Sequence, residues 1–340
     1  MSGEPGSGPF VTWRGEDSRG GSRGATRPGS ILILGLPYFG KLLAGRLRER
    51  GWKAEYLPHP GRSPQGWARL APKVARASVL YLISSRIERG CPQDWMMRLR
   101  KKPVVIHWVG TDALEAVQAA RRGPLSQRLV RGATHWVDAP WLADELAPLG
   151  IRAQYVALPI PIPRGDPPPL PAEFRVLLYL QEESEYRQVF DVPTLLRLPG
   201  ALPEARFTLI PSSAGSLRPL FEGGYPQNLA TPGYVRDMDA LYRETTVLVR
   251  LTTHDGMSFM ANEALARGRY VIWTYPLEGA IQASGFEAVT AALRGLFDQH
   301  RQGTLTLNEA GREATLAAFD PVKVLDELDR RLLLLSGGHP

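Results

Sequence analysis

A short polar segment follows a buried apolar run in the second half of the chain and brings two acidic residues into one stretch. The run Thr246–Val249 leads to Arg250, and Asp255, Gly256 and Glu263 follow it. In a parallel sheet, a strand-to-helix corner of this kind offers unpaired N–H groups and the positive end of the helix dipole to an anion. We therefore expect this corner to bind a diphosphate.

The two carboxylates have different surroundings. Asp255 belongs to the loop and can reach a ligand from there, whereas Glu263 lies over a turn deeper, beside the small apolar residues 264–266. A carboxylate among such neighbours is costly unless it accepts hydrogen bonds, and sugar or ribose hydroxyls donate them. The alternative is that Glu263 pairs with Arg267 or Arg269 as a surface charge.

Strands and helices alternate through both halves of the chain and must position this corner. This alternation predicts α/β structure, with each half a doubly wound, Rossmann-like domain whose parallel sheet is covered on both faces. The expected strands are Ile31–Leu34, Ser78–Ile83, Val104–Trp108, Thr134–Val137, Phe174–Leu180, Phe207–Ile210, Thr246–Leu251 and Tyr270–Thr274. The expected helices include Trp141–Leu149, Met238–Arg243, Ser258–Arg267, Ala288–His300 and, after an Asp320 N-cap, Pro321–Leu335.

Composition shifts along the chain suggest its domain boundaries. The N-terminal stretch is rich in Gly, Ser and Arg, and the stretch from Pro159 to Pro171 is too rich in proline to continue a helix or sheet. The expected parts are a disordered tail (1–29), an N-terminal acceptor domain (30–160), a proline-rich linker (161–171), a C-terminal donor domain (172–320), and a C-terminal helix and tail (321–340).

Charge is divided unevenly between the halves. Residues 31–164 carry a formal charge of +12, and residues 165–340 carry −6. The basic half is expected to face a membrane surface, a phosphorylated acceptor or nucleic acid, the alternative being a solvated basic surface with no specific partner. Because no apolar run is long enough to span a membrane and no secretory signal is present, we expect a cytoplasmic protein.

Cysteine and histidine usage argues against several kinds of site. Cys91 is the only cysteine, which excludes an internal disulfide and predicts an unremarkable buried thiol. The six histidines are scattered without metal-ligand spacing, so no metal site is expected.

The corner resembles the Glu-x7-Glu region of family 4 glycosyltransferases. Asp255-x7-Glu263 is followed by Ala-Leu-Ala-Arg-Gly and the strand Tyr270–Trp273, as in that family. The resemblance implies a GT-B fold, with a cleft between its two Rossmann-like domains. It also implies transfer of a hexosyl group from a nucleoside-diphosphate sugar to a hydroxyl, with retention of configuration and with no metal or other cofactor required.

The resemblance also assigns roles to the residues of the corner. Asp255, where the family has Glu, would hold the donor sugar with a shorter reach, and Glu263 would hold the ribose hydroxyls. The backbone N–H groups of Gly256, Met257 and Ser258 would meet the sugar or the phosphates. These assignments make the segment the centre of the predicted donor site.

Two further stretches resemble the same family. The Thr231–Met238 loop would place the nucleobase near Tyr234 and Val235, the alternative being an unligated turn. Asp112, which follows the strand Val104–Trp108, would orient the acceptor hydroxyl or else cap the helix that begins beside it. His107 lies inside that strand, two residues before the family's histidine position, so we expect it to be structural.

The diphosphate needs a cation that the usual position does not supply. The family has Arg and Lys after the first strand of the second domain, but Leu180–Glu185 is acidic here. Arg250 is our candidate, because a guanidinium binds two phosphate oxygens at once. The alternative is that Arg250 pairs with Glu182 or Glu183.

The loop from Gly35 to Gly40 admits a rival interpretation. We expect it to face the cleft, but with Glu55 further on it is also a partial match to the dinucleotide fingerprint of NAD(P)-dependent oxidoreductases. It has only two of the three glycines that this fingerprint requires. A Walker-type phosphate loop is excluded, because Leu42 follows Lys41 where Ser or Thr is required.

The stretch Trp95–Lys102 combines apolar bulk with basic residues. It fits a surface that contacts the inner face of an anionic membrane, which suits a lipid-linked or cell-surface glycan acceptor. The alternative is a helix that packs Trp95, Met96 and Leu99 on the core. No nucleic-acid partner is expected for the enzyme, although a non-catalytic GT-B-like protein docked on membrane or nucleic acid is the main alternative function.

Overall fold

The computed structural model describes residues 27, 29–61, 63–99, 102–181, 187–221 and 224–337, with the backbone alone at 98 and 99. Contacts divide these residues into two compact units. The N-terminal unit contains residues 27–160, 254–257 and 319–337, and the C-terminal unit contains 161–253 and 258–318. The predicted tail, 1–29, lies almost wholly outside the described residues.

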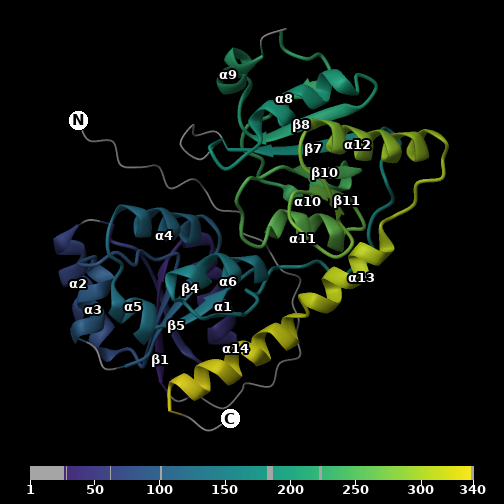
Figure 1. The fold of residues 1–340 in the computed structure, drawn as a ribbon. Helices are drawn as coiled ribbons and strands as arrows, with labels where there is room; N and C mark the ends of the chain where they lie inside the picture. Colours follow the sequence, from purple (N-terminus) through teal and green to yellow (C-terminus); the bar gives the residue numbers. More distant parts are fainter. Residues whose placement is uncertain are drawn as a thin grey trace. The chain divides into compact units, whose positions relative to one another are not determined.

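Six parallel strands form the sheet of the N-terminal unit, in the order β2-β1-β3-β4-β5-β6. Figure 1 shows this sheet among the helices of its unit. Strand β1 pairs with two neighbours, so that Ile33 lies opposite Tyr56 on one side and Tyr81 on the other. The strands are β1 (Ser30–Gly35), β2 (Lys53–Pro58), β3 (Val79–Ile83), β4 (Val104–Trp108), β5 (Thr134–Val137) and β6 (Ala153–Tyr155).

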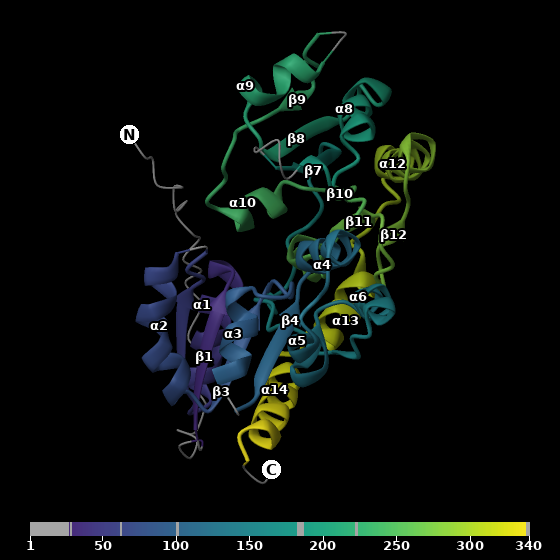
Figure 2. The same cartoon turned by 60° about the vertical axis from the view of Figure 1, so that its left-hand side comes forward.

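Helices cover both faces of this sheet because its strands are apolar on both sides. Leu32 and Leu34 pack in one cluster with α2 to α6, and Ile31 and Ile33 pack in another with α1 and α14. Figure 2 shows these helices along the strands of the sheet. The helices are α1 (Pro37–Glu49), α2 (Pro64–Arg76), α3 (Pro92–Leu99), α4 (Thr111–Arg122), α5 (Gln127–Gly132), α6 (Pro140–Leu146), the 3₁₀ turn η1 (Ala147–Leu149) and α14 (Pro321–Leu335).

The last helix, α14, belongs to the N-terminal unit although it comes last in sequence. Its buried residues Leu328 and Leu332 join the cluster around Ile31 and Ile33. The predicted cap is present, since the Asp320 carboxylate accepts hydrogen bonds from the Val322 and Lys323 N–H groups at 2.9 and 3.0 Å. The prediction of a helix over Pro321–Leu335 is confirmed.

The C-terminal unit has a second parallel sheet, in the order β12-β11-β10-β7-β8-β9. After β7, β8 and β9 extend the sheet to one side, and β10 then returns to the other side of β7. The strands are β7 (Arg175–Leu180), β8 (Arg206–Pro211), β9 (Leu229–Ala230), β10 (Val247–Arg250), β11 (Tyr270–Trp273) and β12 (Ile281–Gln282).

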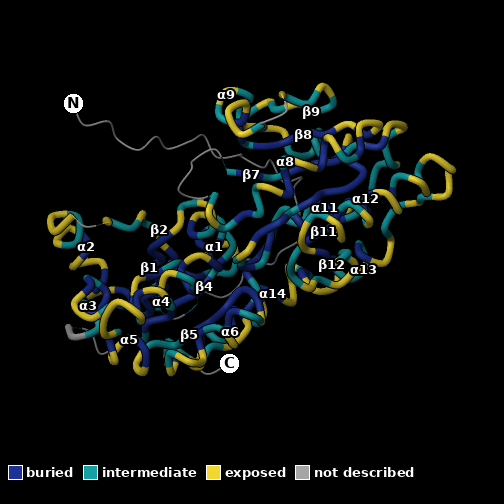
Figure 3. Tube along the Cα trace, turned by 45° about the horizontal axis from the view of Figure 1, so that its top comes forward, coloured by how far each residue is buried: buried dark blue, intermediate teal, exposed yellow. Residues whose placement is uncertain are grey.

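Helices also cover this sheet, and the strands are the most buried parts of the C-terminal unit (Figure 3). Val176 and Leu178 of β7 pack with Leu195 of α8 and Leu293 of α12. The helices are α8 (Val192–Ala201), α9 (Ala214–Leu217), the 3₁₀ turn η2 (Arg218–Leu220), α10 (Met238–Arg243), α11 (Phe259–Ala266), α12 (Phe286–Arg301) and α13 (Glu309–Ala318). The predicted α/β fold with two Rossmann-like units is therefore confirmed.

The strand orders locate a switch point in each sheet. The chain leaves β1 towards β2 and returns to pair β3 on its other side, and it likewise leaves β7 towards β8 and returns to pair β10. In open α/β sheets, ligands bind outside the carboxyl ends of the strands that flank such a point. This rule indicates the ends of β1 and β3 in one unit and of β7 and β10 in the other.

Candidate functional site

Arg250 lies at the switch point of the C-terminal sheet as the last residue of β10. Its guanidinium carbon is 5.0 Å from the ring centroid of Tyr179 and 6.0 Å from that of Phe190. Stacking on two aromatic rings holds the cation at the carboxyl edge of the sheet, where an anion would approach. The alternative partners Glu182 and Glu183 lie outside the described residues.

Glu263 lies in the middle of α11 and is only partly exposed. Its Oε2 accepts a hydrogen bond of 3.1 Å from the Tyr242 hydroxyl, and no described residue donates to its Oε1. Burial raises the pKa of this carboxyl group to about 7, against smaller lowering effects of Arg267 and of the Tyr242 hydrogen bond. Glu263 is thus a carboxyl group with one oxygen left to accept hydrogen bonds.

The arginines proposed as alternative partners of Glu263 are used elsewhere. The Arg267 guanidinium pairs with Asp239 and donates to the backbone oxygen of Glu263 at 2.8 Å, not to its carboxylate. Arg269 is fully buried and donates through Nε to the backbone oxygen of Tyr242 at 2.9 Å. A surface ion pair is therefore not the role of Glu263 in this structure.

Ser258 caps α11 with its side chain. Its Oγ accepts from the Ala261 N–H at 3.2 Å, and its carbonyl oxygen accepts from the Asn262 side-chain amide at 2.8 Å. A serine at this position satisfies one of the unpaired N–H groups of the first turn. The predicted corner, in which β10 ends and a helix opens after Ser258, is present.

The segment between β10 and this cap, His254–Met257, packs within the N-terminal unit. The Trp141 indole N–H donates to the Asp255 carbonyl oxygen at 2.7 Å, and His254 Nε2 is 2.7 Å from Glu145 Oε2. The Met257 N–H donates to Asp138 Oδ1 at 3.3 Å. The Met257 N–H group, predicted to meet the donor, is therefore engaged by a carboxyl group that the sequence analysis did not consider.

Gly256 has a steric reason to be glycine. A Cβ atom there would lie 2.4 Å from the Val109 carbonyl oxygen and 2.8 Å from Asp138 Oδ1. Any side chain would force these groups apart, so the close approach of this segment to the ends of β4 and β5 depends on Gly256.

Asp112 and Asp138 follow β4 and β5 and are both buried, at 4% and 2% exposure. Asp112 Oδ1 accepts from the Val109 and Ala113 N–H groups at 3.0 and 3.1 Å, so the carboxyl group organises the first turn of α4. Burial raises the pKa of Asp112 to about 7 and that of Asp138 well above its ordinary value.

Gly35 and Gly40 are both required by packing. Gly35 has φ +132°, and a Cβ there would lie 1.8 Å from the Ile83 carbonyl oxygen, at the switch point between β1 and β3. A Cβ at Gly40 would lie 2.3 Å from the Tyr56 ring. These contacts explain both glycines without a bound dinucleotide.

The remaining predicted residues differ in exposure. Tyr234 is 52% exposed in the loop before α10, beside the partly buried Val235. His107 is fully buried, its Nδ1 lies 2.6 Å from the Tyr81 hydroxyl, and burial lowers its pKa to about 3. His107 is a neutral residue of the sheet interior, and Tyr234 is exposed at the surface.

The structure corrects one expectation about α3. Trp95 is 54% exposed, whereas Gln93 and Asp94 are buried. Asp94 accepts from the Ser126 hydroxyl at 2.6 Å, so a polar contact anchors the buried side of α3. The alternative that packed Trp95 on the core is therefore wrong, while Met96 does pack there; the Leu99 side chain lies outside the described residues.

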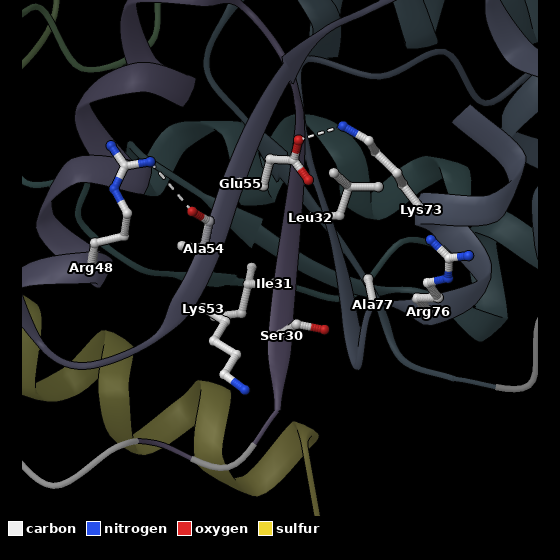
Figure 4. A pocket seen from close by; sticks show the side chains of 10 residues that line it. All are labelled: Ser30, Ile31, Leu32, Arg48, Lys53, Ala54, Glu55, Lys73, Arg76 and Ala77. Atoms are coloured by element: carbon white, nitrogen blue, oxygen red, sulfur yellow. Dashed lines mark hydrogen bonds and ion pairs between the residues drawn. The ribbon is translucent and has the colours of Figure 1, made fainter. Parts of the chain in front are cut away.

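A basic hollow of about 440 Å³ lies at the amino ends of β1 and β2 (Figure 4). Lys73 pairs there with Glu55 at 2.5 Å, whereas Lys53 and Arg76 have no acidic partner among the described residues. Figure 4 shows the basic head groups spread to either side of β1 and not converging on one point. The hollow is therefore part of a basic surface, at the opposite strand ends from the switch point.

No family model matches the chain, and no curated protein matches its sequence. Solved structures resemble its fold. A sucrose-phosphate synthase from Thermosynechococcus elongatus has a TM-score of 0.63 at 14% identity, with 90% of this chain and 99% of that one covered. The pneumococcal O-GlcNAc transferase GtfA, in complex with UDP and GlcNAc, has a TM-score of 0.57 at 13% identity, with 79% and 59% covered.

A third similar structure is an epimerase. The UDP-GlcNAc 2-epimerase from Neisseria meningitidis, bound to UDP-GlcNAc, has a TM-score of 0.54 at 10% identity, with 89% of this chain and 99% of that one covered. The chain thus spans the whole length of some similar structures and about three fifths of GtfA. At these identities the likeness establishes the two-unit Rossmann-like fold.

Proposed function

We propose that this protein is a glycosyltransferase that moves a hexosyl group from a nucleoside-diphosphate sugar to a hydroxyl acceptor. The observation that carries the proposal is Glu263, a carboxyl group with a raised pKa and one oxygen that accepts no hydrogen bond from the described residues, on the helix that follows the strand ending at Arg250. Perturbed carboxyl groups beside a sheet switch point are typical of binding sites. The shared fold with GtfA, whose structure holds UDP and GlcNAc, supports the same class of donor.

Each part of the donor has a proposed partner. The stacked Arg250 guanidinium neutralises the diphosphate, and the ribose hydroxyls donate to Glu263. Asp255 holds the sugar, and the nucleobase lies near Tyr234 and Val235. Stabilising the departing diphosphate is electrostatic catalysis. We propose, from the resemblance to family 4 glycosyltransferases, that the transfer needs no metal or other cofactor and retains the anomeric configuration.

Product analysis tests this proposal. The protein is incubated with UDP-, GDP- and ADP-hexoses and a membrane glycolipid extract, and NMR identifies the new glycosidic bond and its configuration. We expect one donor series to give an α-glycoside from an α-linked donor, with release of the nucleoside diphosphate. A β-glycoside would overturn the proposed retention of configuration. If folded protein consumes none of the donors, the proposed transferase activity is overturned.

We further propose that the N-terminal unit docks on the inner face of an anionic membrane, where a lipid-linked acceptor is available. The exposed Trp95 ring and the basic hollow with Lys53 and Arg76 support this proposal, since aromatic rings and basic side chains bind anionic interfaces. Among the described residues, no helix is long and apolar enough to cross a membrane.

Liposome flotation tests the docking. Wild-type protein should float with phosphatidylglycerol vesicles at low salt and be released at 1 M salt, where the screening length falls to about 3 Å. Trp95→Ala should weaken binding roughly tenfold or more, because burying a large apolar side chain contributes about 1.5–3 kcal/mol. Equal flotation with neutral vesicles, or no flotation at all, would contradict the proposal.

Epimerisation of a nucleotide sugar is the second candidate function. It is favoured by one observation, the likeness over almost the whole length of an epimerase bound to UDP-GlcNAc. The product analysis separates the two, because an epimerase converts the sugar of the donor without any acceptor, whereas a transferase moves it to a second molecule.

A further inference from the structure

The segment His254–Met257 is held in place by three polar contacts and one close backbone approach. Trp141 and Asp138 bind backbone groups of the segment, and Glu145 binds its histidine side chain. Gly256 supplies the close approach to Val109. Of the two carboxyl groups among these contacts, that of Asp138 is almost completely buried, at 2% exposure, and it touches the segment at Gly256 and Met257.

Asp138 lies among other acidic groups. The side chains that act on it electrostatically are Asp112 from α4 and Asp255 from the segment, and Tyr155 of β6 also faces it. On the same segment, His254 pairs with Glu145 of α6. Asp112 Oδ2 and Asp138 Oδ2 are both buried with no hydrogen-bond partner among the described residues. Two ionised carboxylates in this arrangement would be strongly unfavourable.

We propose that Asp138 is a positioning residue for the predicted donor segment: its neutral carboxyl group holds His254–Met257 in place, and its ionised form releases it. The inference rests on the proposed function, because it concerns the segment that carries Asp255. It adds a residue and a pH dependence that the proposed donor contacts do not include.

Two opposing effects decide the sign of this dependence. Ionisation strengthens the hydrogen bond from the Met257 N–H, since bonds to charged acceptors are stronger than bonds to neutral ones. Burying the charge beside Asp112 and Asp255 costs more, because an unpaired buried carboxylate loses its hydration without a compensating partner. Opening the segment hydrates Asp138 and removes that penalty, so ionisation favours release.

Hydrogen–deuterium exchange of peptides containing Gly256 and Met257 tests the proposal on the full-length protein without any donor. After correction for the intrinsic exchange rate, protection in the wild type should fall by up to tenfold per pH unit as Asp138 ionises, the limit for a single linked proton. Asp138→Asn keeps an oxygen acceptor and cannot ionise, so its protection should not change with pH. Asp112→Asn removes a neighbouring carboxylate charge that disfavours ionisation of Asp138, so the transition should move downwards in pH, and an upward shift would contradict the proposal.

The control is exchange in β4, which must stay equally protected in every sample. Protection of the segment that does not change with pH in the wild type would overturn the proposal, as would a folded Asp138→Asn with lost protection at every pH. If Asp138→Asn does not fold, the pH dependence of the wild type still decides.

Activity is a separate readout. If glycosyl transfer is found, kcat/KM should fall at high pH along the exchange transition, and Asp138→Asn should remove that fall. If no donor is turned over, the proposed function fails while the exchange result still decides the role of Asp138.

Discussion

Replacing Glu263 with glutamine should stabilise the protein and weaken nucleotide binding at the same time. The carboxyl group is partly buried beside Tyr242, and its pKa is raised from 4.5 to about 7. The folded state therefore disfavours the ionised form. Glutamine keeps an oxygen to accept from the Tyr242 hydroxyl and carries no charge.

The size and pH window follow from this shift. The folded pKa lies about 2.5 units above the unfolded value, and each unit corresponds to about 1.4 kcal/mol, so the ionised carboxylate costs up to about 3 kcal/mol. The cost is absent below pH 4.5, grows between 4.5 and 7, and is constant above 7. Glu263→Gln should thus be up to about 3 kcal/mol more stable at pH 8 and no more stable at pH 4.

Urea unfolding, monitored by a signal that reports on the C-terminal unit, measures this difference in the free energy of unfolding. Glu278→Gln is the matched control. Glu278 is exposed in the same unit, so its replacement should have little effect at either pH. Glu263→Gln should also bind the preferred nucleoside diphosphate roughly tenfold or more weakly, because bonds to a charged acceptor contribute about 1.5–3 kcal/mol. A Glu263→Gln protein that is less stable than the wild type at pH 8, or that binds the nucleotide as tightly as the wild type, would refute the reasoning.

The remaining predictions address other parts of the chain. Calorimetry should show nucleotide affinity rising by up to tenfold per pH unit from about 5 to 7 and then levelling off, because the ionised Glu263 is the better acceptor; the rise should be absent in Glu263→Gln. Gly35→Ala should lose about 2 kcal/mol or more in urea unfolding, since φ is +132° and the Ile83 carbonyl oxygen blocks a Cβ; Gly45→Ala, with open space in α1, should be neutral or slightly stabilising. In thermal-shift titrations, Arg250→Ala should weaken the binding of a nucleoside diphosphate but leave the binding of the nucleoside unaffected.

Apolar runs made the central strands predictable. Ile31–Leu34 and Val104–Trp108 are buried on both faces, so they read as continuous apolar stretches and were located correctly. The edge strand β2 was missed because Lys53 and Glu55 break its run, and an edge strand needs only one apolar face. The corner after β10 was predictable because its glycine and capping serine are local signals.

Contacts between distant parts of the chain were not predictable in this way. Nothing in the local pattern of α14 indicates that it covers the N-terminal sheet, since amphipathic helices fit any apolar surface. Asp138 was overlooked, although its place directly after the strand Thr134–Val137 was a usable signal. The large apolar side chain of Trp95 favours a buried position in the local sequence pattern. The hydrogen bond between Asp94 and Ser126, which are distant in the sequence, is not visible in that pattern.

Thermal-shift binding of UDP, GDP and ADP, with their hexoses, to wild type and Glu263→Ala tests the central claim most directly, because a ligand of the native state raises the melting temperature by mass action. The account predicts that one diphosphate series raises the melting temperature of the wild type and leaves that of a folded Glu263→Ala nearly unchanged. A well-folded wild type that responds to none of them would contradict the donor site.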